Sequence, residues 1–199
     1  MHTLKSPFSF IISTSDFSIS SQVQHFFLHF SGNHILKEKG DFNMYISENI
    51  KFLRELTQSS QRTFDRMIFP FYSIDTQITY KLENGRYSNP LPFLINIANF
   101  FHISLDKLIY RPITEKDLNK VPQERNMNYF YPNFIMVKKD NKFTLKDIAE
   151  YTNISINTIT NYSRKCINYT IRLENLNSIS TFLDCSFDEL LSPPSKKQY

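Results

Sequence analysis

Short, uncharged polar side chains gather on one face of the helix expected over residues 156–164. At helical spacing, Asn157, Thr160 and Asn161 point away from the apolar Ile159. These side chains donate and accept hydrogen bonds without adding charge, and an amide can pair with both polar atoms that adenine presents in the major groove. A solvated surface helix would carry the same residue types. The segments around this face therefore decide between a binding surface and an ordinary one.

Two short helices joined by a tight turn are expected around this face, over residues 144–164. The first helix is predicted at residues 146–152, and Asn153 lies in the turn, where a left-handed backbone favours Gly and is tolerated by Asn. Ser155 can cap the second helix through its hydroxyl. Ala149 must be small, because the second helix is expected to cross close above it. The positions expected to face inward are Ile148, Ala149, Ile159 and Tyr162.

This spacing resembles the DNA-binding helix-turn-helix, in which the second helix lies in the major groove and its first residues reach base edges. The match covers the small residue, the turn residue and the apolar positions in one register. An ordinary helical hairpin in a bundle is the alternative interpretation.

An earlier segment, residues 44–112, carries a second set of expected short helices. They are predicted near Ser47 and through Leu56, at residues 60–68 and 75–83, after Asn89-Pro90, and from Ser104 to just before Pro112. Their order, the SQ pair that opens the second helix and the phrase LENGRYSNP after the third resemble the lambda-repressor-like, or Cro/XRE, family. There are two departures. Asp65 stands where the family usually has Ala, and the turn at residues 69–73 is longer by several residues.

The sequence also repeats internally. Residues 97–109 (IANFFHISLDKLI) align without gaps on residues 179–191 (ISTFLDCSFDELL), and residues 49–54 align on residues 133–138. Apolar, capping and acidic positions coincide: Ser104 with Ser186, Leu105 with Phe187, Asp106 with Asp188. Chance rarely preserves both order and register over such a length.

The repeat predicts an all-α fold of two tandem small helical bundles, about five helices each, of the lambda-repressor-like helix-turn-helix type. The expected parts are a first domain at residues 44–112, a linker at 113–128, a second domain at 129–194 and a tail at 195–199. Residues 1–43 are expected to be a poorly structured N-terminal extension. Lys39-Gly40-Asp41 can be encoded by a purine tract that resembles a ribosome-binding site, so we take Met44 as a hypothetical true start.

The resemblance implies two base-reading faces and a set of phosphate contacts. Gln77 and Asn157 would each pair with an adenine, and Ile156 would meet a thymine methyl, which biases the site toward A·T pairs. The base-reading residues would be Thr76, Gln77, Tyr80, Ser155, Ile156, Asn157, Thr160 and Asn161. The phosphate contacts would be Ser60, Gln61, Arg62, Lys81, Arg86, Thr144, Lys146, Arg164 and Lys165. Any single basic residue among them could instead be a solvated surface charge.

The composition argues against several other classes of function. The 199 residues carry a formal net charge of +4, which permits a polyanionic partner without requiring one. The three Gly residues argue against a Gly-rich phosphate loop or a dinucleotide fold. No catalytic arrangement stands out, so we expect no enzyme activity, no cofactor and no metal site. Cys166 and Cys185 fit no metal or redox spacing and are expected to be buried thiols in a reducing cytoplasm.

The expected function is that of a cytoplasmic, sequence-specific DNA-binding transcriptional regulator, most simply a repressor, with double-stranded DNA as its partner. Two copies in one chain could imitate a two-fold dimer that reads half-sites about 34 Å apart, or only the second copy could bind DNA while the chain forms a homodimer. The alternative is a degenerate helix-turn-helix that binds protein, such as an antitoxin or a phage-type inhibitor. No run of apolar residues is long enough for a membrane span, and no small-molecule ligand is implied.

Overall fold

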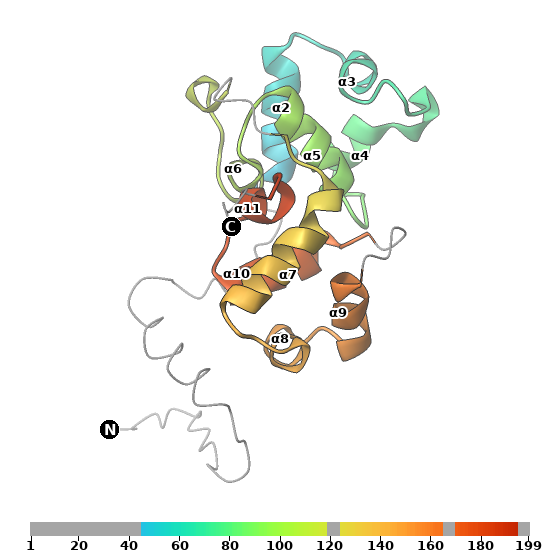
Figure 1. The fold of residues 1–199 in the computed structure, drawn as a ribbon. Coiled ribbons are helices and arrows are strands. Elements are labelled where there is room, and N and C mark those ends of the chain that lie inside the picture. The colour runs from blue at the N-terminus through green and yellow to red at the C-terminus, as the bar shows by residue number, and fades with distance from the viewer. Residues whose placement is uncertain (1–44, 119–123, 165–169, 195–199) are drawn as a thin grey trace, which may run out of the picture. The chain divides into compact units, whose positions relative to one another are not determined.

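The computed structural model describes residues 45–118, 124–164 and 170–194 (Figure 1). Every regular element in these ranges is helical, which confirms the predicted all-α class. Residues 41–199 form one compact unit. The predicted extension at residues 1–43, the hypothetical start at Met44 and the tail at residues 195–199 lie outside the described residues.

The described helices fall into two sets along the chain. The first half of the compact unit contains α2 (Ile46–Leu56), α3 (Gln61–Ile68), α4 (Ile78–Glu83), α5 (Leu91–Phe100) and α6 (Leu105–Tyr110). The second half contains α7 (Phe130–Asp140), α8 (Leu145–Thr152), α9 (Ile156–Ser163), α10 (Leu173–Leu183) and α11 (Phe187–Leu191). Short 3-10 turns lie at Ile74–Thr76, Glu115–Asp117 and Met127–Tyr129.

Every α-helix of each half contributes two or more buried side chains to the core. No α-helix in the described ranges exceeds 11 residues, and isolated helices of this length are marginal in water, so packing must hold them. The fully buried side chains of the first half include Ile50, Leu53, Phe64, Ile78, Leu82, Leu94, Leu105 and Leu108. Those of the second half include Phe134, Ile148, Ile159, Leu176, Ile179, Phe187 and Leu190.

A buried asparagine ties the first helix of each half to the end of its last helix. The Asn49 amide donates to the carbonyl oxygens of Leu108 and Arg111, at 2.9 and 2.8 Å. In the second half, the Asn133 amide donates to the carbonyl oxygens of Glu189, Leu190 and Ser192, at 3.0, 3.1 and 2.8 Å. The carbonyl groups at a helix C-terminus have no partner within the helix, and these amides supply one inside the core.

Left-handed backbone conformations also recur at aligned positions. Gln58 and Lys142, which follow the first helix of each half, have φ of 50° and 60°. His102 and Asp184, which precede the last helix of each half, have φ of 51° and 50°. Positive φ is uncommon for residues other than Gly, so its recurrence at the same two places of each half reflects a shared backbone path.

The two halves differ most between their second and third helices. We predicted one helix over residues 75–83, and this is wrong. Ile74–Thr76 is a 3-10 turn, Gln77 has a left-handed φ of 50°, and α4 begins only at Ile78. Gln77 provides no side-chain cap for α4. Every residue of an α-helix has a negative φ, so the positive φ of Gln77 interrupts the helix. The longer connection of the first half therefore leads into a separate helix of six residues.

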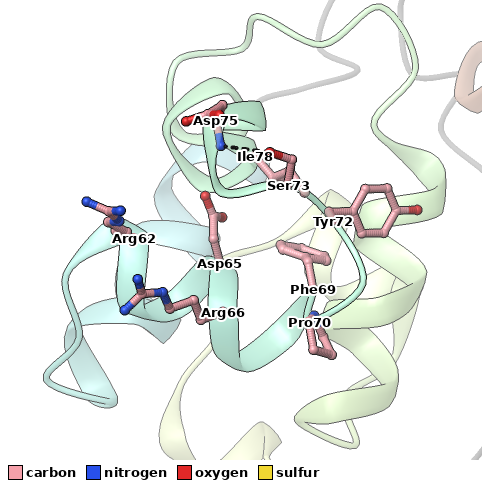
Figure 2. Close-up of a pocket in the computed structure, with 9 residues that line it drawn as sticks. All are labelled: Arg62, Asp65, Arg66, Phe69, Pro70, Tyr72, Ser73, Asp75 and Ile78. Carbon is pink, nitrogen blue, oxygen red and sulfur yellow. Dashed lines mark hydrogen bonds between the residues drawn. The ribbon is translucent and has the colours of Figure 1, made fainter.

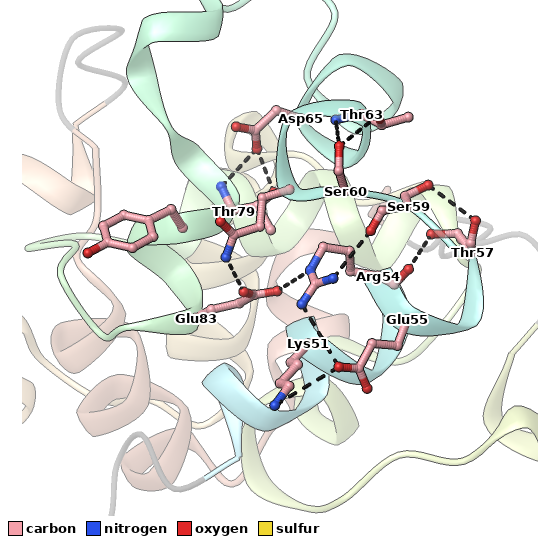
Figure 3. A network of polar contacts seen from close by, with 12 residues as sticks. Lys51, Arg54, Glu55, Thr57, Ser59, Ser60, Thr63, Asp65, Thr79 and Glu83 are labelled. Carbon is pink, nitrogen blue, oxygen red and sulfur yellow. Dashed lines mark hydrogen bonds and ion pairs between the residues drawn. The ribbon is translucent and has the colours of Figure 1, made fainter.

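Asp65 of α3 supplies the cap that Gln77 lacks. Its Oδ1 atom accepts hydrogen bonds from the Thr79 backbone N–H at 2.8 Å and from the Thr79 hydroxyl at 2.5 Å, and both residues are buried (Figure 3). A carboxylate at the first turn of a helix binds N–H groups that have no partner within the helix. The aligned position in the second half is Ala149, where a short turn makes such a cap unnecessary. Asp65 therefore fixes α4 against α3.

Replacing Asn133 with Ala should lower the free energy of unfolding by roughly 2–3 kcal/mol, because the carbonyl groups that end α11 would lose their buried donor. Urea unfolding measures this loss. Asn128→Ala, at an exposed position near the start of the same half, is the matched control and should change stability by less than about 0.5 kcal/mol. Equal effects of the two substitutions would contradict the assigned role of Asn133.

Replacing Asp65 with Ala should cost about 1–3 kcal/mol, since α4 would lose its cap and Thr79 its buried acceptor. Asp65→Asn keeps an acceptor oxygen in the same place and should retain most of the stability. Thermal unfolding of the three proteins at one pH compares them. Losses of equal size in both variants would mean that the negative charge, rather than the hydrogen bonds to Thr79, stabilises this connection.

Candidate nucleic-acid interface

Local hydrogen bonds cap both helices of the helix-turn-helix in the second half, α8 and α9. The Thr144 hydroxyl accepts from the Asp147 N–H at 3.1 Å, and the Asp147 carboxylate accepts from the Thr144 N–H at 2.8 Å, which caps α8. Asn153 ends α8 with a left-handed φ of 55°, as predicted. Ser155 caps α9 by accepting from the Thr158 N–H at 3.2 Å, also as predicted.

The inner face of α9 is anchored by two buried side chains. Ile159 is fully buried, and Tyr162 packs edge-on against Phe130 with ring centroids 5.8 Å apart. The Tyr162 hydroxyl accepts a hydrogen bond from the Asn175 amide at 2.8 Å, so α9 is held by both α7 and α10. Ala149 is buried where α8 meets α9, as its small size predicted. These contacts fix which face of α9 remains outward.

The outward face of α9 carries the residues predicted to read bases. Ser155, Ile156 and Asn157 are exposed, and Thr160 and Asn161 are partly buried one turn later. Ile156 is 46% exposed, a large value for an apolar side chain. The Ser155 oxygen already serves the cap and lies 2.8 Å from the Thr158 hydroxyl, so its part is to orient the start of the helix. Within the described ranges, no hydrogen bond engages the exposed Asn157 amide.

Two of the basic residues predicted near this face are exposed. Lys146, on the first turn of α8, lies 3.5 Å from Glu150 in an ion pair of exposed side chains. Such a pair contributes little and can open without much cost. Arg164 follows α9 directly and is exposed. Lys165 lies outside the described residues.

In the first half, a partly buried ion pair engages the side chain of Gln61, one of the predicted phosphate contacts. The Arg54 Nε atom donates to Glu83 at 2.6 Å, and the Gln61 amide donates to the other oxygen of Glu83 at 2.5 Å (Figure 3 shows the Arg54–Glu83 pair). These bonds join α2, α3 and α4. The Ser60 hydroxyl likewise accepts from the Thr63 N–H at 3.2 Å. The Gln61 and Ser60 side chains are therefore both hydrogen-bonded within the protein. Backbone N–H groups in the first turn of α3 are the groups that could still bind a phosphate.

Three other residues predicted for the first half, Tyr80, Lys81 and Arg86, take part in contacts between a cation and an aromatic ring. The Arg86 guanidinium lies 5.3 Å from the centre of the Tyr80 ring, and the Lys81 ammonium lies 5.7 Å from the Tyr87 ring. The Thr76 hydroxyl donates to the Ser73 carbonyl at 2.6 Å, which leaves it less able to read a base. Gln77 is exposed. The structure thus brings Tyr80 and Arg86 together but does not give the first half a continuous reading helix.

An open depression of about 610 Å³ lies beside the connection from α3 to α4. Figure 2 shows Arg62 and Arg66 on one side of it, with Phe69 and Tyr72 on the other. Arg66 is not among the residues predicted from the sequence, although its place four residues after Arg62 predicts the same helix face. Phe71, on the inserted connection, is 98% exposed.

No helix in the described ranges is long and apolar enough to span a bilayer. In the same ranges, no three side chains of His, Cys, Asp or Glu are placed to hold a metal ion together.

Comparison with known proteins identifies one region. No curated protein and no solved structure gives a significant match to the chain. Residues 135–196 match the family model described as the Cro/C1-type HTH DNA-binding domain. The match begins inside α7 and includes α8 to α11, and hence the anchored α9 with its polar outward face. Residues 135–196 therefore resemble an XRE-type HTH domain, the kind of domain that DNA-binding regulators carry.

Proposed function

We propose that the protein is a sequence-specific DNA-binding transcriptional regulator that acts as a repressor. The observation that carries this proposal is α9. Its inner face is fixed by Ile159 and Tyr162, its outer face presents amide and hydroxyl groups, and it lies in the region similar to Cro/C1-type domains. A helix held in this way can enter the major groove with a defined set of side chains toward the bases.

The side chains of α9 favour A·T base pairs. The exposed Asn157 amide can donate to N7 and accept from the amino group of adenine in one bidentate contact. Ile156, next to it, offers an apolar surface to a thymine methyl group. Thr160 and Asn161 lie one turn further along and would meet a neighbouring base pair or a phosphate. Occupancy of a site that overlaps a promoter is enough for repression.

Phosphate contacts would set the register of α9 on the duplex. The N-terminus of α8, with eight residues in the helix, directs backbone N–H groups outward beside Lys146. Arg164 follows the last turn of α9 and can reach the opposite strand. These contacts add affinity that depends on salt but not on sequence.

We extend the proposal to the first half as a second copy of the same domain. Its support is the recurrence of the Asn49 and Asn133 ties, of four left-handed residues at aligned positions and of the gapless alignment of residues 97–109 on 179–191. In this copy Arg62, Arg66 and Arg86 would contact phosphates, and Gln77 would be the main base-reading side chain.

A second candidate function applies to the first half. The inserted connection carries Phe71 at 98% and Tyr72 at 45% exposure, beside a helix α4 of only six residues. Exposed aromatic side chains of this kind are typical of protein-binding surfaces. The first half would then be a degenerate helix-turn-helix that binds another protein, as antitoxins and phage-type inhibitors do.

The full chain should bind DNA from upstream of its own gene more tightly than a scrambled duplex of equal length. Asn157→Ala should weaken specific binding by roughly 10- to 100-fold, since one bidentate base contact is worth about 1–3 kcal/mol. Fluorescence anisotropy at fixed salt measures this. Asn128→Ala is the matched control and should bind like the unmodified protein. Equal affinity for both duplexes would contradict sequence-specific regulation.

Lys146→Ala and Arg164→Ala should act differently from Asn157→Ala. Each should weaken specific and scrambled duplexes about equally and should reduce the slope of log affinity against log salt by about 1. Lys51→Ala removes an exposed charge from α2 and serves as the control with an unchanged slope. A slope that stays constant in all three variants would show that neither residue contacts a phosphate.

A further inference from the structure

The last helices of the two halves cap each other. The Asp106 carboxylate of α6 accepts hydrogen bonds from the backbone N–H groups of Phe187 and Asp188 in α11, at 3.1 and 3.2 Å. In return, the Asp188 carboxylate of α11 accepts from the Leu105 N–H in α6, at 3.1 Å. Both contacts use the first turn of the opposite helix, where N–H groups have no partner within the helix. In Figure 1, α6 and α11 lie side by side.

This exchange has the form of a two-fold interface. Leu105 aligns with Phe187 and Asp106 with Asp188, so the bond from the Phe187 N–H to Asp106 and the bond from the Leu105 N–H to Asp188 are counterparts in which the two halves change places. The bond from the Asp188 N–H to Asp106 is an additional contact on one side. In a symmetric dimer, residue i of one subunit contacts residue j of the other, and j contacts i. The two halves of one chain therefore meet as two subunits of a homodimer would.

Other side chains of the same chain also pack and form hydrogen bonds or ion pairs at this interface. Arg125, only 4% exposed, forms an ion pair with Asp188. The Asn99 amide holds the Arg125 backbone at both its N–H and its carbonyl, at 3.0 and 2.8 Å. The Tyr110 ring lies 5.6 Å from that of Phe187. Burial, together with the charge of Asp188, raises the pKa of the Asp106 carboxyl. All of these contacts join parts of one chain, and Arg125 and Phe187 are buried in them.

The reading elements of the two halves do not share this symmetry. In the second half, α9 has eight residues and starts at a capping serine, Ser155. In the first half, α4 has six residues and follows Gln77, which has a left-handed backbone and makes no side-chain cap. The two halves thus combine a symmetric interface with chemically different outward faces.

We infer that one chain, acting as a monomer, binds one bipartite DNA site whose two half-sites differ in sequence. This rests on the proposed function and adds the class of DNA. The half-sites lie on one face of the duplex, about one helical turn apart. The second half reads one of them through Asn157, and the first half reads the other through Gln77.

Selection of the full chain's sites from a random duplex library tests the inference without any variant. The enriched duplex is then analysed by hydroxyl-radical footprinting and by sedimentation of the complex. We expect one chain per duplex, a consensus without two-fold symmetry and two protected stretches. Replacing either half-site with an inverted copy of the other should weaken binding about tenfold or more, because several base pairs would then be mismatched.

Two variants assign the half-sites. Asn157→Ala should reduce protection at one stretch, and Gln77→Asn at the other. Asn tolerates the left-handed backbone of Gln77 while shortening the amide, so the fold is kept. Two chains per duplex, a palindromic consensus, or a single protected stretch under one chain would each overturn the inference and leave the proposed function standing. Failure to enrich any sequence would overturn the proposed function itself, and the inference with it.

Discussion

Two buried asparagines hold together a protein made of helices that are too short to be stable alone. In each half the first helix donates an amide to the carbonyl groups that end the last helix, and so closes the helical set on itself. The apolar side chains between these two helices can pack only if the ends stay in register. Removing an amide in such a place leaves several buried acceptors unpaired at once, which is more costly than losing a single exposed bond. The helix-turn-helix of the second half, and the pair α3 and α4 of the first half, pack within these closed sets.

The third helix of each half is positioned by different chemistry within its closed set. In the second half, a small residue at Ala149 and a left-handed Asn153 allow a tight turn, and α9 is placed by apolar packing and by the hydrogen bond between Tyr162 and Asn175. In the first half, a longer connection leaves α4 without a cap of its own. Asp65 then reaches across from α3 to bind Thr79, and Glu83 is fixed by Arg54 and Gln61. These polar contacts thus hold α4 in place, which the tight turn and packing do for α9 in the second half.

Local signals in the sequence predicted most helices of the fold. These signals act within a few residues, so they can be read without knowing the fold. They are the apolar spacing of α5, α9 and α10, the left-handed residues Asn153 and Gly85, and the capping residues Ser60, Ser104, Thr144, Ser155 and Ser186. The first helix, predicted to begin near Ser47, is not capped by that residue. The helix already begins at Ile46, and the Ser47 hydroxyl donates to the Leu82 carbonyl instead.

The features that sequence could not predict depend on residues far apart in the chain. The break of the expected helix at Gln77 follows from a carboxylate in another helix, and the crossed contacts of Asp106 and Asp188 join residues more than 80 positions apart. The aligned Asn49 and Asn133 were visible as a repeat, but their hydrogen bonds were not. Among the candidate site residues, the outward face of α9 was predicted from helical spacing, because its inner face is plainly apolar. The engagement of the Gln61 and Thr76 side chains within the protein was not, since their partners lie in other turns.

The crossed capping of α6 and α11 bears on how such a protein can change over time. In a homodimer every substitution occurs twice, so a new base preference alters both halves of the site together and must be matched by two changes in the DNA. In a pair joined within one chain, a substitution occurs once. Asp106 and Asp188 preserve the junction between the halves, while the outward residues of α4 and α9 are free to diverge separately. Under the proposed function, one half of the DNA site could then shift by a single base while the other half continues to hold the protein in place.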